Sequence, residues 1–160
     1  MVRGMRAVLL LFLASPAAAQ GLDVRADLVA LCAEPVCIGA EAEICMAGDG
    51  GTTTVGMGAC LSAEADLWDA RLNAAYGPLR DAYRRTDVEN EMAGWAAPSR
   101  ADALREMQRA WIAYRDATCA LAAAQFGGGT GRGPAHAACR LEETARQALE
   151  LEALLDEAGR

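Results

Sequence analysis

The chain has 160 residues, with 15 basic residues, all of them arginine, against 22 acidic residues, and a net charge of −7. The absence of lysine excludes Schiff-base and lysine-nucleophile chemistry. The acidic balance argues against nucleic acid or an anionic membrane as a partner, because both repel a chain of the same sign. The length suits one domain with a modest core.

The first 19 residues have the pattern of a secretory signal peptide. Arg3 and Arg6 precede an apolar run over residues 7–14, and small residues 17–19 offer a cleavage site near Ala19. The run is about half of the roughly 20 residues that span a bilayer, so we expect no membrane span. Removing the segment leaves 13 basic and 22 acidic residues, a net charge of −9. We expect a periplasmic or secreted protein.

Six cysteines follow this segment. An even number of cysteines in an exported chain predicts a disulfide framework, because the compartment is oxidising. A zinc site is the rival interpretation, but the chain has no Cys-x-x-Cys pair, and His136 is its only histidine. We therefore expect no metal and no cofactor. The cysteines are Cys32, Cys37, Cys45, Cys60, Cys119 and Cys139.

Residues 20–59 predict a cysteine-rich front segment. Two short helical pieces flank a break near Pro35, and a Gly- and Thr-rich loop is expected over residues 47–58. Residues 60–160 predict a helical domain, and we expect residues 20–160 to fold as one unit.

Residues 61–83 carry apolar side chains at steps of three and four, which predicts a helix. Gly77 and Pro78 favour a kink in it, or a break. Residues 86–97 lack a sustained apolar stripe and are expected to form a connection. The stripe consists of Leu61, Ala65, Trp68, Leu72, Tyr76, Leu79 and Tyr83.

Ser99 and Asp102 have the spacing of a helix N-terminus, and the helix that follows is expected to stop at Gly127. Pro134 suits the first turn of a last helix. No strand pattern of useful length is present, so the fold class is all-α, a small antiparallel helical bundle with disulfides. The apolar positions of the helix from Ser99 are Leu104, Met107, Trp111, Tyr114, Thr118 and Leu121, and those of the last helix are Leu141, Ala145, Ala148, Leu151 and Leu155.

This layout favours particular disulfides. Cys119 and Cys139 lie at similar distances from the turn between the last two helices, so they fall at similar heights on antiparallel neighbours. The other four are then expected to pair locally. The choices are Cys45 with Cys60 across the Gly/Thr loop and Cys32 with Cys37 across the break at Pro35.

Catalytic interpretations are weak. His136 and Cys139 share a helical face, but an exported cysteine is expected to be oxidised and unavailable as a nucleophile. The glycine-rich stretch 127–133 lacks the lysine and the strand-to-helix context of a phosphate loop. We therefore expect a binding protein and not an enzyme.

Polar residues flank the stripes of two helices and form the candidate binding set. Two interpretations stay open for them, namely a hydrogen-bonded network between the helices and a groove for a ligand. The set comprises Asp69, Asn73 and Tyr76 on one helix and Gln108, Trp111 and Arg115 on the next.

These residues also carry a family resemblance, which covers about residues 60–150. The chain resembles the LprI-type lysozyme inhibitor N-terminal domain family. Of the two runs of residues that carry the resemblance, the second, which begins at Gln108, is the more specific. The residues concerned are Trp68, Asp69, Leu72, Asn73 and Tyr76, then Gln108, Arg109, Ala110, Trp111, Ile112, Tyr114, Arg115, Asp116 and Cys119, with Cys139 and Arg146 further on.

The resemblance implies an exported helical domain that binds and inhibits a lysozyme. Charge makes a cationic lysozyme a suitable partner for this acidic chain. The loop 127–133 is expected to present Arg132 to the catalytic carboxylates of the enzyme. The alternative is a non-inhibitory interaction module of the cell envelope that uses the groove or the cysteine-rich front; the oligomeric state stays open.

Overall fold

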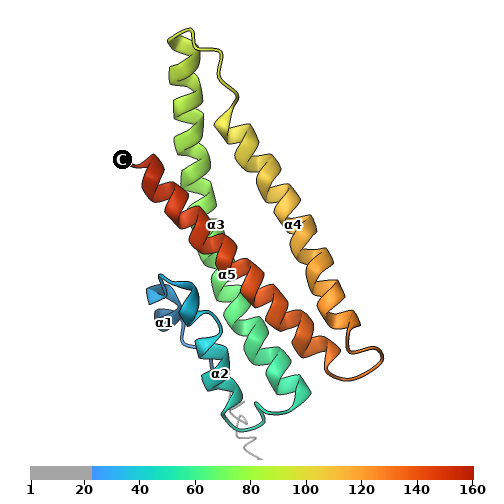
Figure 1. The fold of residues 1–160 in the computed structure, drawn as a ribbon. Coiled ribbons are helices and arrows are strands. Elements are labelled where there is room, and N and C mark those ends of the chain that lie inside the picture. The colour runs from blue at the N-terminus through green and yellow to red at the C-terminus, as the bar shows by residue number, and fades with distance from the viewer. Residues whose placement is uncertain (1–22) are drawn as a thin grey trace, which may run out of the picture.

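The computed structural model describes residues 23–160, and the predicted signal peptide lies outside them. Within that part the chain is helical and has no strand, so the all-α prediction is confirmed. Three long helices form an up-down-up bundle, in which the first and third run in the same direction and the second runs antiparallel to both, and a short helical front packs beside it (Figure 1). The elements are α1 (Ala26–Leu31), η1 (Pro35–Cys37), α2 (Ala40–Met46), α3 (Thr54–Met92), α4 (Arg100–Ala124) and α5 (Arg132–Ala158).

Helix α3 is longer at both ends than the sequence pattern predicted. It begins inside the expected loop because the Thr53 side chain accepts a hydrogen bond from Gly56 N at 2.9 Å and caps the first turn. It continues to Met92, through part of the expected connection, where its last turns extend beyond the end of α5 (Figure 1). Those turns have little to pack against, which explains why they lack an apolar stripe.

Pro78 lies inside α3 without ending it, so a break at this point was the wrong alternative. Pro78 has no N–H to donate to the carbonyl four residues earlier in the helix. Because Pro78 lies on the exposed side of α3, water can reach that carbonyl instead. Gly77 before it has no Cβ, so part of the usual clash with the proline ring is absent. Leu72, Ala75 and Leu79 are buried on both sides of the proline, so packing against the bundle keeps the helix continuous there.

Helices α3 and α5 form the main seam of the bundle. Its small residues allow the two backbones to approach closely, and Trp68 and several leucines fill the space between them. Helix α5 crosses α3 and continues beside α4 (Figure 1). The buried small residues are Ala65, Ala75, Ala145 and Ala148, and the large ones are Trp68, Leu72, Leu79, Leu141 and Leu151.

Helix α4 begins as predicted, with the Ser99 side chain accepting from Asp102 N at 3.1 Å. Its buried face differs from the predicted stripe. Tyr114 and Leu121 are 59% and 64% exposed, whereas Gln108 and Cys119 are buried. The prediction was wrong here because α4 meets the bundle along a narrow strip, which periodicity cannot locate among so many apolar residues.

The N-terminus of α4 is held by a side chain from α3. The Asp87 carboxylate accepts hydrogen bonds from Arg100 N at 2.8 Å, Ala101 N at 3.1 Å and the Ser99 hydroxyl at 2.8 Å. The hydrogen bond from Arg100 N is the largest of the effects that hold the pKa of Asp87 below its usual range. The two helices are thereby joined on both sides of their connection.

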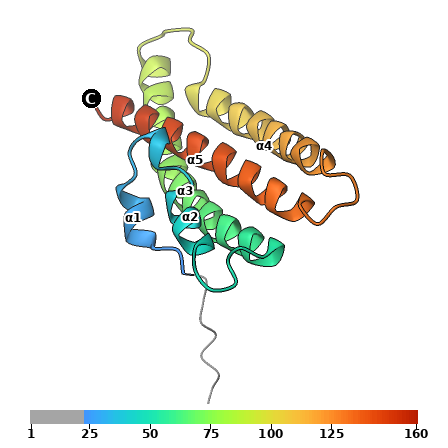
Figure 2. The ribbon, with the colours of Figure 1, turned by 60° about the horizontal axis from the view of Figure 1, so that its bottom comes forward.

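The front segment forms the two short α-helices that were predicted, α1 and α2, but a 3-10 helix, η1, lies between them where a break at Pro35 was expected. The segment lies on the side of α3 opposite α4 (Figure 2). A fully buried carboxylate from α3 holds it in place. Glu64 accepts hydrogen bonds from Gly39 N at 2.8 Å and Ala42 N at 2.7 Å at the start of α2, and from the Trp68 indole at 3.1 Å. The carboxylate thus satisfies two donors at the positive end of α2.

Arg71, one helical turn after Trp68, holds the end of α1. Its guanidinium donates to the carbonyls of Val29 at 2.7 Å and Cys32 at 2.8 Å, and to Glu152 of α5 at 2.9 Å. It also stacks on Trp68, 4.4 Å from the ring centroid. One arginine therefore joins the front segment, α3 and α5.

Three disulfides connect the elements, and they are the pairs that the sequence layout favoured. Cys32 pairs with Cys37 and Cys45 with Cys60, both within or beside the front, and Cys119 of α4 pairs with Cys139 of α5. Within residues 23–160 no helix combines the length and hydropathy needed to cross a membrane.

Replacing Glu64 with Gln should lower the free energy of unfolding by about 3 kcal/mol, because the amide opposes buried N–H groups that now donate to a carboxylate. Urea unfolding monitored by circular dichroism measures this. Glu150→Gln, on the exposed face of α5, is the matched control and should stay within about 0.5 kcal/mol of the parent. Equal stabilities for the two variants would contradict the anchoring role of Glu64.

Asp87 should give the fold an acid-sensitive component. A carboxylate with a lowered native pKa stabilises the protein above its unfolded pKa of about 3.9, and this contribution disappears as pH falls through the lower native value. Asp87→Asn should therefore reduce the Tm at pH 7 and differ less from the parent near pH 2.5. Glu89→Gln, with an exposed side chain on the same helix, is the control and should show no such convergence.

Candidate functional site

A groove runs between α3 and α4, which we call the α3/α4 groove, with a volume of about 390 Å³. It brings together six of the seven predicted binding residues, all except Arg132. Leu72 and Gln108 are its buried members, and Tyr76 and Trp111 are half-buried. The lining residues are Asp69, Leu72, Asn73, Tyr76, Arg105, Gln108, Arg109, Trp111, Ile112 and Arg115.

Of the two interpretations left open for these polar residues, the structure favours the groove, because within residues 23–160 no hydrogen bond joins the set on α3 to the set on α4. On α3, Asn73 donates to Asp69 Oδ2 at 2.9 Å, within its own helix. On α4, Gln108 accepts from Gln147 of α5 at 2.9 Å, and so joins α4 to a different neighbour. The two helices leave space between the polar groups at this level, and these groups line a groove.

Each aromatic side chain of the groove lies beside a cation. Arg115 stacks over Trp111 at 4.9 Å from the ring centroid, and Arg80 lies 5.8 Å from that of Tyr76. The Arg115 side chain is itself largely buried, so its guanidinium forms part of the groove wall beside the indole. The wall therefore combines flat apolar surface with fixed hydrogen-bond donors.

Sequence reasoning missed four members of the lining, Leu72 and Ile112 among its apolar residues and Arg105 and Arg109 among its cations. Leu72 was assigned to the core stripe, where it also belongs. Arg105 and Ile112 lie three before and four after Gln108, which is the spacing of one helical face. That spacing could have indicated that these residues share a face of α4. Only the position of α3 shows that this face borders the groove.

Arg132, the seventh predicted residue, lies at the other end of the molecule from the α3–α4 connection. It is the first residue of α5 and exposed, so the helix begins within the stretch expected to be loop. The turn before it includes Gly127 in the left-handed region, with φ of 55°, and Phe126, which is 53% exposed. We call residues 125–132 the hairpin tip.

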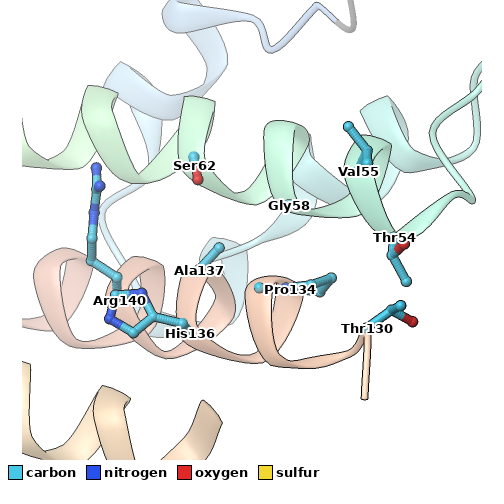
Figure 3. A pocket seen from close by; sticks show the side chains of 10 residues that line it. Thr54, Val55, Gly58, Ser62, Thr130, Pro134, His136, Ala137 and Arg140 are labelled. Carbon is cyan, nitrogen blue, oxygen red and sulfur yellow. The ribbon is translucent and has the colours of Figure 1, made fainter. Parts of the chain in front are cut away.

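Beside the hairpin tip, a cavity of about 630 Å³ lies between the first turns of α3 and α5. Figure 3 shows Thr54, Val55 and Ser62 along α3, which lies opposite Thr130 in the turn before α5 and Pro134 in the first turn of α5. Arg140 reaches from α5 toward α3, where it pairs with Asp66. Among the described residues, none of those lining this cavity is acidic, and the first turns of α3 and α5 contain no acid either.

Within the described residues, no cysteine is available as a reactive group at either site. All six are in disulfides within the described part of the chain, so none is left as a thiolate nucleophile or a metal ligand. Cys119–Cys139 ties the hairpin tip down a few residues from each of its ends. Disulfides of this kind fit an oxidising compartment.

The described part of the chain is a small helical bundle tethered by disulfides, with an aromatic groove between α3 and α4. The model of the family described as "Lysozyme inhibitor LprI" matches residues 45–151, and the chain belongs to this family. The resemblance stated from the sequence is thereby confirmed. The match begins inside α2, so most of the front segment lies before it.

The chain is also similar to "Uncharacterized protein R02472" of Rhizobium meliloti (strain 1021), with 36% identity over 90 residues. The alignment covers 56% of this chain and 65% of that protein, so the chain spans just under two thirds of its relative's length. No solved structure matches the chain.

Many of the residues that carry the family resemblance line the α3/α4 groove. Nine of its ten lining residues are among them, and Arg105 is the exception. A residue set used only for the core would be expected to be buried, yet Asn73, Arg109 and Ile112 of this set are exposed. Exposed polar and aromatic residues gathered in one groove are typical of binding sites.

Replacing Cys119 and Cys139 together with Ser should lower the free energy of unfolding by about 3 kcal/mol, the value expected for a closed loop of 20 residues. Denaturant unfolding without reductant measures the loss. The Cys32–Cys37 bridge closes a loop with a separation of only five residues. Replacing both of its cysteines with Ser should therefore lower the free energy of unfolding by less. A larger loss for this second pair would contradict the ranking by loop length.

Proposed function

We propose that this protein is exported and binds a peptidoglycan-cleaving lysozyme, using the hairpin tip as the contact that blocks the enzyme. Membership of a family of lysozyme inhibitors supports the partner. The observation that carries the proposal is an exposed Arg132 at the positive end of α5, on a tip tethered by a disulfide. The oxidised cysteines support export.

Charge supports the encounter between the two proteins. The chain without residues 1–19 has a net charge of −9, from 13 basic and 22 acidic residues. A cationic lysozyme is attracted to such a body over distances of about a Debye length, roughly 8 Å at physiological salt. This attraction raises the association rate more than it raises the affinity.

The hairpin tip has the opposite local character. Arg132 stands where the helix dipole of α5 is positive, and no acidic residue of the first turn compensates it. A carboxylate supplied by a partner would pair with the guanidinium and accept from the Gly133 N–H. Arg132 N and Ala135 N already donate to the Gly129 and Gly131 carbonyls, and Pro134 has no N–H. Retaining glycosidases such as lysozyme present two carboxyl groups about 5–5.5 Å apart in their cleft, which is the kind of target that this tip suits.

Rigidity supports inhibition as well as binding. The Cys119–Cys139 bridge limits the conformations of the tip before the partner arrives. A pre-organised loop loses less conformational entropy on binding, so more of the contact energy appears as affinity.

The test is a turbidity assay of lysozyme acting on cell walls in the presence of the oxidised protein. The parent should slow clearing, and Arg132→Ala should weaken inhibition at least tenfold because it removes the only charged side chain of the hairpin tip. Arg85→Ala, an exposed arginine on α3, is the matched control and should inhibit like the parent.

Full inhibition by both Arg132→Ala and a variant lacking Gly128 and Gly129 would show that the tip is not the inhibitory element. If the parent itself neither inhibits nor binds lysozymes of the animal type, the lysozyme proposal fails for that class. The protein would then be better described as a non-inhibitory interaction module of the cell envelope.

A further inference from the structure

The α3/α4 groove carries cations that are already neutralised. Arg109 pairs with Glu106 at 3.1 Å and Arg115 with Asp116 at 2.8 Å, both within α4. Arg105 is paired in the same way, with Asp102 at 2.9 Å. An anionic ligand would have to displace these carboxylates, and a cationic one would meet the guanidinium groups first. The groove therefore favours a ligand without net charge.

Hydrogen-bonding groups of both kinds line the groove. Asp69 and Asn73 present oxygen acceptors from α3, whereas the guanidinium groups and the Trp111 indole N–H present donors from α4. A ligand matched to this lining must itself carry donors and acceptors along its length. Neutral polyhydroxylated chains have that property.

Flat and apolar surfaces complete the groove. The rings of Tyr76 and Trp111 are half-buried, and the guanidinium of Arg115 extends the flat surface beside the indole. Leu72 and Ile112 are the aliphatic members. The C–H faces of sugar rings pack against such surfaces. A partner helix would instead need a row of apolar contacts at helical spacing, which two aliphatic side chains do not provide.

We propose that the α3/α4 groove binds a neutral N-acetylated saccharide chain of the N-acetylglucosamine kind, whose acetamido groups also occur on the glycan strands that lysozymes cleave. An acetamido group presents one N–H donor, one carbonyl acceptor and one methyl group. The groove offers an acceptor in Asp69, donors in the α4 arginines and an apolar contact in Ile112. Its volume of about 390 Å³ holds part of such a chain, with the rest continuing along the surface.

This site is separate from the hairpin tip, so the inference goes beyond the proposed lysozyme contact. A protein with both sites would hold its inhibitory tip close to the glycan on which the enzyme works. Binding to one site and to the other can therefore fail independently.

The experiment titrates N-acetylchitotetraose into the disulfide-bonded protein and follows heat and tryptophan fluorescence. The parent should bind, and Trp111→Ala should weaken binding at least tenfold. Trp95→Ala is the matched control, because Trp95 is 70% exposed and lies on the α3–α4 connection outside the groove. Cellotetraose, which lacks the acetamido groups, should bind at least tenfold more weakly than the chitin fragment.

A second variant guards against a folding effect. Asn73→Ala changes an exposed side chain whose hydrogen bonds stay within α3, so it should keep the parent's Tm and still weaken binding several-fold. Direct binding to lysozyme, measured without glycan, should be unchanged in Trp111→Ala and lost in Arg132→Ala.

The inference is overturned if the parent gives no signal with N-acetylchitotetraose at millimolar concentration, or if Trp111→Ala binds it as tightly as Trp95→Ala. Equal affinity for cellotetraose would overturn the assignment of the acetamido group. Loss of direct lysozyme binding in Trp111→Ala would make the groove a protein contact instead, and would also contradict the separation from the hairpin tip.

Discussion

The buried carboxylate of Glu64 is the contact on which the arrangement of the whole molecule depends. It is fully buried, and the donors that satisfy it come from two elements, α2 and the Trp68 side chain of α3. Burying a charge is costly unless it is paired or hydrogen-bonded, so the front segment can occupy one position only. Arg71, two turns after Glu64, has a similar role, since its guanidinium donates both to the end of α1 and to Glu152. The polar anchor and the apolar seam between α3 and α5 therefore lie on the same stretch of α3.

The α3/α4 groove is a consequence of how α4 is held. Its first turn is fixed to α3 by Asp87, and its last turns are fixed to α5 by the Cys119–Cys139 bridge. Between these points α4 contacts α5, as the Gln108–Gln147 hydrogen bond shows, and leaves α3 partly uncovered. The polar residues of α3 that face this space pair within their own helix. An opening of this kind needs no flexible loop, and its walls are regular helices, which position side chains more precisely than loops do.

The two candidate surfaces differ in electrostatic character although they belong to one acidic protein. Groove cations are matched by neighbouring acids on α4, whereas Arg132 stands uncompensated in the first turn of α5. A neutral polar ligand and an acidic protein cleft are the respective complements. The two proposed functions thus fall on separate surfaces, and the disulfide that tethers the tip also fixes one end of the groove wall.

Local patterns in the sequence determined much of the fold. The cap at Ser99, the separation of α1 from α2 near Pro35, the stripes of α3 and α5 and the hairpin that brings Cys119 opposite Cys139 depend on neighbours within a few turns, so they could be predicted. The exposure of Tyr114 and Leu121 and the roles of Glu64 and Asp87 could not. Each depends on contacts between residues 12 or more apart in the chain, or on which face a neighbouring helix covers. The same holds for the candidate binding residues. The sequence by itself selected Asp69, Asn73, Tyr76, Gln108, Trp111 and Arg115. Only the tertiary structure decided that they line an open groove, because the distance between two helix axes is set by packing along their whole length.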